Sequence, residues 1–202
     1  MQDKKTFSQQ TFNKQAETYD QAIYGQHARS LYPFMLEKII HHYGQDILDV
    51  GCGTGELMKQ ILEEDPSRKL TGIDYSPNMI EQAKQKLDNL ATFQFADAQK
   101  LPFADNTFDM VTCCDSFHHY PDPDAVLQEM VRVLKPSGCL ILGDCYQKGL
   151  SRFLMNLFMR YSREGDVKIY SRQEITAMVQ EYFHAVKWEQ VNSRSYILVG
   201  IK

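Results

Sequence analysis

The stretch DVGCGTGEL, residues 49–57, places three glycines within five positions directly after a short apolar run. Glycine costs backbone entropy on folding and offers no side chain to pack, so three of them indicate that something else needs the room. The usual occupant of such a turn is part of a nucleotide, lying against bare backbone at the amino end of a helix. The stretch therefore predicts a strand, a glycine turn and a helix that bind a nucleotide or nucleoside.

The spacing of the glycines separates these two classes of ligand. In the dinucleotide fingerprint G-x-G-x-x-G the third glycine keeps the pyrophosphate site uncharged, but that position here is Glu56. A glutamate near the amino end of the helix suits the helix dipole and repels a pyrophosphate. The pattern of Gly51, Gly53 and Gly55 therefore favours a nucleoside over a dinucleotide.

Asp74 supports a nucleoside. It ends the apolar run KLTGID (69–74), where an acidic side chain can accept hydrogen bonds from both ribose hydroxyls. The alternative is a helix-capping aspartate, but Ser76, followed by Pro77, already suits that role.

Apolar runs alternate with helical patterns from residue 46 to about residue 182, which is typical of a parallel sheet built from strand–helix–strand units. We expect strands at 46–51, 69–74, 92–96, 108–114 and 138–145, and helices at 55–64, 76–88 and 123–134. The tail from Phe183 to Ile201 predicts two strands joined by QVNSR as a hairpin.

Helical patterns also precede the first strand and follow the fifth. Before the first strand the apolar positions are Phe12, Ala16, Tyr19 and Ile23, then Leu36, Ile39, Ile40 and Tyr43 before Gly44. After the fifth strand, an apolar stripe of Leu150, Phe153, Leu154, Leu157, Phe158 and Tyr161 lies opposite Arg152, Asn156, Arg160 and Arg163.

The net charge and the distribution of apolar residues limit which partners and which cellular location are expected. The 202 residues carry a formal net charge of −4, which gives no overall attraction to nucleic acid or anionic membranes. The first dozen residues contain no apolar core of signal-peptide length, and no apolar stretch reaches about 18 residues. We therefore expect a cytoplasmic protein without nucleic-acid binding or stable membrane insertion; nothing in the sequence specifies an oligomeric state.

The five cysteines predict neither disulfides nor a metal site. Their number is odd and no two form a C-x-x-C pair, which argues against a disulfide framework. Two histidines lie near Cys113 and Cys114, but the spacing is wrong for a zinc site. We expect buried free thiols and no metal.

The chain resembles the class I S-adenosylmethionine-dependent methyltransferases of the methyltransferase 11 type, and is similar to the ubiquinone/menaquinone-biosynthesis enzymes. The resemblance lies in FNKQAETYD (12–20), DVGCGTG (49–55), FADAQKLPFADNTFDMV (95–111) and SFHHYPDPDAVLQEMVRVLKPSGCLILGD (116–144). It implies a Rossmann-like α/β fold, a doubly wound seven-stranded sheet, mostly parallel with one antiparallel strand, under an N-terminal helical cap. Ser137-Gly138 departs from the two glycines usual in the family.

The expected organisation is one domain over residues 1–202. Its parts are a helical cap (1–44), a cofactor-binding core (45–145), a lid (149–170) and a C-terminal helix with a strand hairpin (171–202).

The resemblance also implies a site for S-adenosylmethionine. The residues expected to bind it are Tyr19, Gly51, Cys52, Gly53, Gly55, Asp74, Tyr75, Met79, Asp97, Ala98 and Cys114. The glycines would line its methionine and ribose part, Asp74 would hold the ribose, and Tyr75 would lie against the adenine.

Three further positions in that set have specific roles by resemblance. Asp97 would accept from the adenine amino group, with the Ala98 backbone beside it; its alternative role is a loop cap. Cys114 would offer its carbonyl to the amino group of the cofactor. Tyr19 would close over the cofactor, although a core aromatic on the Phe12 stripe is an equal alternative.

Methyl transfer from a sulfonium is a direct displacement, so the protein mainly holds nucleophile, methyl and sulfur in line. A general base is needed only when the nucleophile must lose a proton. His118 and His119 follow the fourth strand, where they could act as base or orient the acceptor. The alternative is that one packs below the cofactor and the other hydrogen-bonds a loop.

The expected function is transfer of a methyl group to a small-molecule acceptor, with the segment 149–170 as a lid over an acceptor that has an apolar part. Two alternatives stay open: a non-catalytic adenosylmethionine-binding module, and a nicotinamide-dependent oxidoreductase. Glu56 and the long segment before the first strand oppose the oxidoreductase.

Overall fold

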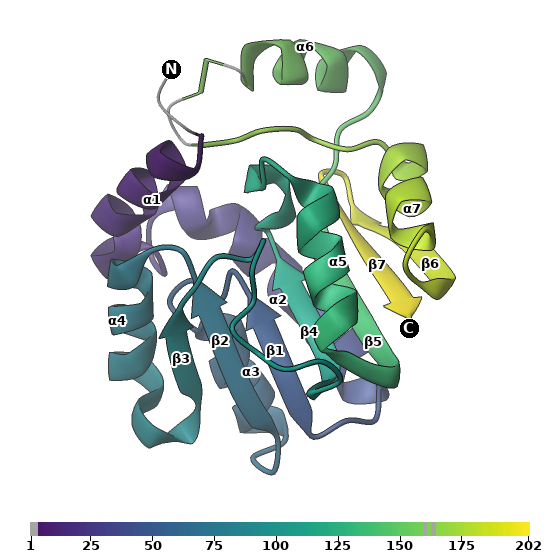
Figure 1. The fold of residues 1–202 in the computed structure, drawn as a ribbon. Helices are drawn as coiled ribbons and strands as arrows, with labels where there is room; N and C mark the ends of the chain where they lie inside the picture. The colour runs from purple at the N-terminus through teal and green to yellow at the C-terminus, as the bar shows by residue number, and fades with distance from the viewer. Residues whose placement is uncertain (1–3, 160, 163–164) are drawn as a thin grey trace.

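The computed structural model describes residues 4–159, 161–162 and 165–202, which form a seven-stranded sheet between two layers of helices (Figure 1). The strands are β1 (Asp46–Val50), β2 (Lys69–Asp74), β3 (Thr92–Phe95), β4 (Phe108–Cys114), β5 (Leu134–Cys145), β6 (His184–Asn192) and β7 (Ser195–Ile201). Their order across the sheet is β3-β2-β1-β4-β5-β7-β6, and β7 is antiparallel to both β5 and β6. The predicted doubly wound sheet with one antiparallel strand is confirmed.

Helices and strands alternate through the first part of the sheet, but no α-helix separates β3 from β4 or β6 from β7. The helices are α1 (Lys4–Gln15), α2 (Gln26–His41), α3 (Glu56–Glu64), α4 (Pro77–Leu87), α5 (Pro123–Val133), α6 (Gly149–Met159) and α7 (Arg172–Gln180). Short 3-10 helices lie at η1 (Ala16–Thr18), η2 (Ile23–Gly25), η3 (Asp88–Leu90) and η4 (Phe117–His119). Ser76 caps α4, because its hydroxyl accepts the Met79 N–H at 3.1 Å, as its position before Pro77 predicts.

Helices cover both faces of the sheet, so the central strands are apolar on both sides. In β5, Leu140 and Leu142 belong to the core under α5 and α7, whereas Cys139 and Ile141 belong to the core under α2, α3 and α4. This double burial explains why the strands appear in the sequence as short continuous apolar runs.

The N-terminal cap is helical, but it differs from the predicted apolar pattern. The helix α1 ends at Gln15, so Tyr19 lies in a turn, and Ile23 is 83% exposed. The buried face of α2 consists of Ala28, Leu31, Tyr32, Met35 and Ile39. Ile40 and Tyr43 are exposed because they lie off that face or beyond the helix end, so their predicted place in the stripe is wrong.

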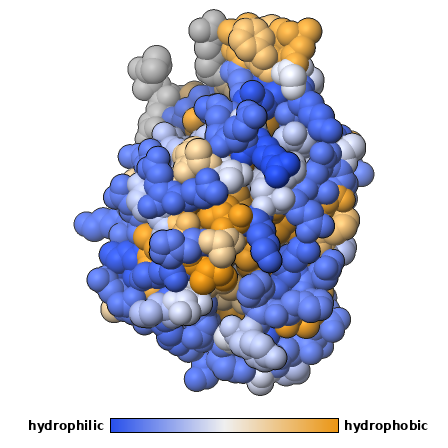
Figure 2. Space-filling model, turned by 90° about the vertical axis from the view of Figure 1, so that its right-hand side faces the viewer, coloured by the Kyte–Doolittle hydropathy of each residue, from blue (hydrophilic) through white to orange (hydrophobic). Residues whose placement is uncertain are grey.

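The helix α6 lies above the carboxyl ends of the strands (Figure 1). None of its residues is buried, and Phe153 and Phe158 are 63% and 64% exposed. Figure 2 shows apolar side chains gathered at the top of the molecule, where α6 lies in Figure 1. Arg160 and Arg163 of the expected polar stripe lie outside the described residues. No helix in the described part of the chain has the length and apolar character needed to cross a membrane.

The strand β5 begins at Leu134, four residues before its predicted start. Leu134 pairs with Phe108, then the ladder breaks and resumes with Cys139 opposite Met110. Within the break, Ser137 has a φ of +65°, in the left-handed region that favours glycine. The serine at this position therefore holds a backbone conformation that a second glycine would adopt without strain.

We expect Ser137→Gly to stabilise the protein. The left-handed conformation costs a non-glycine residue roughly 1–2 kcal/mol, and the extra freedom of glycine in the unfolded chain offsets about 0.5–1 kcal/mol of that. Urea unfolding should show a gain of about 0.5–1 kcal/mol in the free energy of unfolding. Ser137→Ala is the control, because it removes the hydroxyl without relieving the backbone; an equal gain in both variants would contradict the explanation.

Candidate active site

A cavity opens at the carboxyl ends of β1, β2 and β4, under the N-terminal helices. Eleven of the thirteen residues proposed from the sequence line it: Tyr19, Gly51, Cys52, Gly53, Asp74, Tyr75, Met79, Asp97, Ala98, Cys114 and His119. The other two, Gly55 and His118, are not among its described lining residues. The ends of parallel strands meet at one edge, which brings together positions far apart in the sequence.

The three glycines of the turn have three different surroundings. A Cβ at Gly51 (φ +79°) would meet the Ser116 hydroxyl at 2.2 Å, so glycine allows a close approach of the loop after β4. At Gly53 (φ +53°) a Cβ would meet nothing within 4 Å, so the backbone faces open space. A Cβ at Gly55 would meet Ala83, Phe93 and Leu87, so this glycine serves helix packing rather than the cavity wall.

Asp74 joins the glycine turn to the end of β2. Its Oδ2 accepts the Gly53 N–H at 2.9 Å and its Oδ1 accepts the Ser76 N–H at 2.8 Å. Burial raises the pKa of Asp74 to about 6, while these backbone hydrogen bonds oppose the rise. Each carboxylate oxygen has a second lone pair, so Asp74 can hold the turn and still accept from a ligand.

Asp97 and Tyr75 lie on the β2–β3 side of the cavity. Asp97 accepts the Gln99 N–H at 3.0 Å, so the loop-cap role is present, and it also pairs with Lys5 of α1. The Lys5 ammonium lies 5.6 Å from the Tyr75 ring centre, and Tyr75 stacks on Phe95. Together these residues form an aromatic and acidic wall suited to a flat base that carries amino donors.

The N-terminal segment forms the roof of the cavity. Lys5, Ser8 and Phe12 of α1 line it, together with Tyr19 from the turn that follows η1. Phe12 meets Tyr19 edge-on at 6.1 Å between ring centres, and burial raises the pKa of Tyr19 above its usual range. Tyr19 therefore both packs on Phe12 and lines the cavity, and the two roles proposed for it are compatible.

Asp49 is a lining residue that the sequence analysis missed. It is 3% exposed, accepts from the Thr112 hydroxyl at 2.7 Å, and its pKa is raised to about 7 by burial. Its place two residues before Gly51, between the apolar residues Leu48 and Val50, was the available signal. Asp115, which directly follows β4, is the second carboxylate that the sequence analysis missed. Its φ is +53°, and its Oδ1 lies 2.6 Å from the His27 Nδ1.

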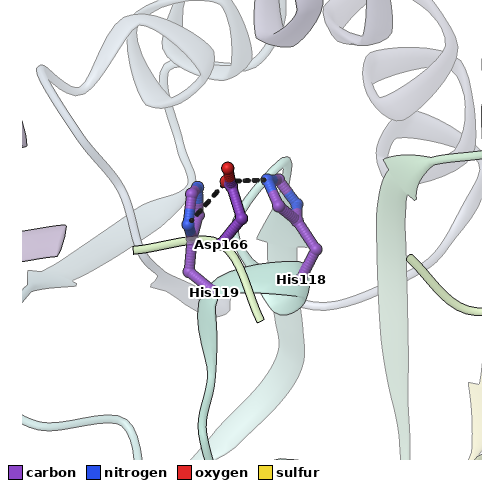
Figure 3. Close-up of side chains that lie close together, drawn as sticks. All are labelled: His118, His119 and Asp166. Carbon is purple, nitrogen blue, oxygen red and sulfur yellow. Dashed lines mark ion pairs between the residues drawn. The ribbon is translucent and has the colours of Figure 1, made fainter. Parts of the chain in front are cut away.

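The two adjacent histidines have different environments. His118 has its Nδ1 2.6 Å from Asp144 Oδ1, and its backbone N–H donates to Asp144 Oδ2 at 2.9 Å. His119 lines the cavity and contacts Phe12 edge-on at 5.2 Å. Its Nδ1 is buried and has no hydrogen-bond partner among the described residues, and burial lowers its pKa to about 4. Figure 3 shows both rings beside Asp166.

The lining residues fit an adenine nucleoside better than a pyrophosphate. Asp49, Asp74 and Asp97 are acidic, and Lys5, the only lysine or arginine among the described lining residues, is paired with Asp97. Glu56 itself does not line the cavity and pairs with Lys86 at 2.8 Å. The buried carboxylates around the turn, rather than Glu56, therefore oppose the binding of a pyrophosphate.

Known proteins resemble this chain in sequence over the same region. Residues 48–142 match a family model described as a methyltransferase domain. The 27-O-demethylrifamycin SV methyltransferase of Amycolatopsis mediterranei is 39% identical over 106 residues, covering 50% of this chain and 39% of that protein. The demethylmenaquinone methyltransferase of Staphylococcus epidermidis is 35% identical over 148 residues, covering 70% of this chain and 61% of that protein.

The fold is also shared. A chain in the complex of the Haloferax volcanii Trm112 methyltransferase activator with its putative methyltransferase superposes with a TM-score of 0.77 at 19% identity, covering 94% of this chain and 96% of the other. In sequence this chain spans 39% and 61% of the length of the two relatives, whereas the fold match extends over most of both chains. Residues 48–142 thus match the methyltransferase domain family, and the chain shares the Rossmann-like fold of this solved structure.

Proposed function

We propose that this protein transfers a methyl group from S-adenosylmethionine to a small-molecule acceptor by direct displacement. The observation that carries the proposal is the cavity itself, in which an open glycine turn at Gly53 adjoins the carboxylates Asp74 and Asp97. The glycine turn would allow a nucleoside to lie close to the backbone, Asp74 would bind its ribose and Asp97 its adenine. The relatives with matching sequence are named as methyltransferases, which agrees with this assignment.

The lining residues would divide the cofactor between them. Gly51 and Gly53 would lie against its methionine and ribose part, Asp74 would accept from the ribose hydroxyls, and Tyr75 would cover the adenine. Asp97 would accept from the adenine amino group. Met79, Ala98, Cys52, Cys114 and Tyr19 would complete the walls, while Gly55 would act through packing.

The bound cofactor would supply an electrophilic methyl group, and the protein would hold the acceptor in line with it. Of the two histidines, His119 lies in the cavity wall and is the one placed to accept a proton or hydrogen bond from an acceptor. His118 is engaged by Asp144 through both its ring and its backbone, so it would act by positioning its neighbour.

The acceptor would have an apolar part. The helix α6 exposes an apolar stripe above the carboxyl edge of the sheet, and Lys4 of α1 donates to the Met159 carbonyl at 2.7 Å. The neighbouring Lys5 lines the cavity, so α6 adjoins its roof. Closure of this helix as a lid would bury both its own stripe and an apolar acceptor. The relatives named for demethylmenaquinone and demethylrifamycin fit such an acceptor.

Two other functions would use the same cavity differently. A non-catalytic binding module would need the cofactor site without an acceptor site, and the exposed α6 stripe favours an acceptor. A nicotinamide-dependent oxidoreductase would need room for a pyrophosphate beside the turn, and Asp49 and Asp74 oppose that charge.

Calorimetry with the purified protein should detect binding of S-adenosylmethionine and S-adenosylhomocysteine, and none of NAD or NADP. A screen of metabolites with methyl-labelled cofactor should then show label transfer to an acceptor. Binding of NAD without adenosylmethionine would reject the proposal, whereas cofactor binding without any transfer would favour the non-catalytic module.

Asp74→Ala should weaken binding of S-adenosylmethionine roughly ten- to a hundredfold, because charge-assisted hydrogen bonds contribute about 1.5–3 kcal/mol. Circular dichroism should confirm that the variant is folded, since Asp74 also holds the glycine turn. Asp105→Ala is the matched control. Asp105 lies in the loop before β4, at the amino end of that strand and away from the cavity, and it pairs with Arg132 of α5. If Asp74→Ala and the wild type bind S-adenosylmethionine equally well, Asp74 does not hold the ribose.

Phe153→Ala and Phe158→Ala should raise the acceptor KM roughly tenfold and leave the affinity for adenosylmethionine nearly unchanged. The reason is that burying a phenylalanine on closure stabilises the closed state by about 1.5–3 kcal/mol. Leu90→Ala, a change at a comparably exposed apolar residue of η3, should alter neither quantity. An unchanged acceptor KM in both α6 variants would contradict the proposal that α6 closes over the acceptor as a lid.

A further inference from the structure

Two histidines and one carboxylate converge beside the cavity (Figure 3). The His119 Nδ1 lies 3.4 Å from Asp166 Oδ1, and the His118 Nε2 lies 3.8 Å from the same oxygen. All three atoms lie within 4.8 Å of one another. We propose that His118, His119 and Asp166 bind one divalent transition-metal cation of the Zn²⁺ class.

The His118 ring is held in the orientation that a metal ligand needs. Its Nδ1 faces Asp144 Oδ1 at 2.6 Å, which leaves Nε2 to face Asp166. Asp144 also accepts the backbone N–H groups of His118 and Cys145. A metal-binding histidine typically donates its second ring N–H to a carboxylate, which fixes its tautomer and raises its basicity. Asp144 therefore supports His118 as an outer-shell partner.

His119 supplies an independent sign of a ligand. Its Nδ1 is buried and has no hydrogen-bond partner among the described residues, although it faces Asp166. A buried polar atom without a partner costs free energy, so it points to something that would satisfy it. A cation between His119 and Asp166 would bond to this nitrogen.

Asp166 is also oriented toward the rings. Its Oδ2 accepts from the Ser162 hydroxyl at 2.9 Å, which turns Oδ1 toward both histidines. The next two residues, Val167 and Lys168, donate their backbone N–H groups to the His118 carbonyl at 2.9 and 3.2 Å. These backbone hydrogen bonds hold the segment after α6 against η4, so the carboxylate stays beside the histidine pair.

The donor set selects the kind of cation. Ligand atoms around a tetrahedral zinc, with bonds of about 2.0–2.2 Å, lie about 3.3–3.6 Å apart, close to the two separations involving Asp166. Imidazole ligands favour zinc and its transition-metal neighbours, whereas calcium and magnesium prefer oxygen. The nearby group of His118, Asp144 and Cys145 is a weaker candidate, because Asp144 already accepts three hydrogen bonds.

Three protein ligands leave a tetrahedral cation with one open position. Because His119 lines the cavity, an acceptor oxygen could occupy that position. This role toward the acceptor rests on the proposed methyl transfer and would replace the proton-accepting role of His119. Binding of the cation does not rest on it.

The test is a titration of tag-free, chelator-treated protein with Zn²⁺ by calorimetry, and with Co²⁺ by visible absorption. We expect one cation per chain and the visible bands of a tetrahedral Co²⁺ site. Asp166→Asn and His119→Gln should each weaken Zn²⁺ binding at least roughly tenfold, since even outer-shell changes cost that much. His41→Gln is the matched control at an exposed histidine and should bind as wild type does.

Circular dichroism and the affinity for adenosylmethionine establish that each variant is folded. Binding of no cation by the wild type would overturn the proposal, leaving an ion-paired His–Asp cluster. Equal Zn²⁺ affinity in Asp166→Asn and wild type would overturn it as well. Both results are independent of the proposed function, because adenosylmethionine binding is measured separately and would survive either one.

Discussion

The carboxylate of Asp74 is the interaction on which the site depends. It accepts one backbone N–H from the glycine turn after β1 and another from the start of α4, so it joins two adjacent crossover connections at the end of β2. Without an acceptor there, the turn would expose unpaired N–H groups at a partly buried edge. The same geometry leaves free lone pairs toward the cavity, so one side chain both shapes the turn and presents an acceptor.

Burial of acidic groups around this turn has an electrostatic consequence. Asp49 and Asp74 have pKa values raised to about 7 and about 6 by desolvation, so each added negative charge in the cavity is unfavourable. In their ionised form, such carboxylates attract the positive charge of a sulfonium and repel the negative charge of a pyrophosphate. The buried pair therefore supports the proposed preference for adenosylmethionine over NAD, together with the spacing of the glycines.

The sequence predicted the sheet well because local patterns determine it. The central strands are buried on both faces, so each appears as an apolar run, and Ser76-Pro77 marks the start of α4. The start of β5 was less predictable, since the pairing of Leu134 with Phe108 depends on a partner strand. Tyr43 was included in the helical pattern because periodicity alone does not show that α2 ends at His41.

Most candidate site residues were predictable because they follow strand ends, and topology brings strand ends together. Gly55 did not follow that logic, because the third glycine faces α4 and β3 rather than the cavity. Asp49 was overlooked because it lies within a strand, although Thr112 from the neighbouring β4 donates to it. The acidic side chain of Asp49 among apolar neighbours was a visible signal, whereas the role of Gly55 emerges only from the packing of α4 and β3.

The segment that follows α6 connects that helix to the histidine pair, and no local pattern could have shown this. Val167 and Lys168 donate to the His118 carbonyl, which places Asp166 beside rings that lie far earlier in the chain. Asn156 of α6 in turn exchanges hydrogen bonds with the Ile169 backbone. A movement of α6 over the cavity would therefore displace the segment that carries Asp166. The proposed closure on an acceptor would therefore be coupled to the geometry at His119 through these hydrogen bonds.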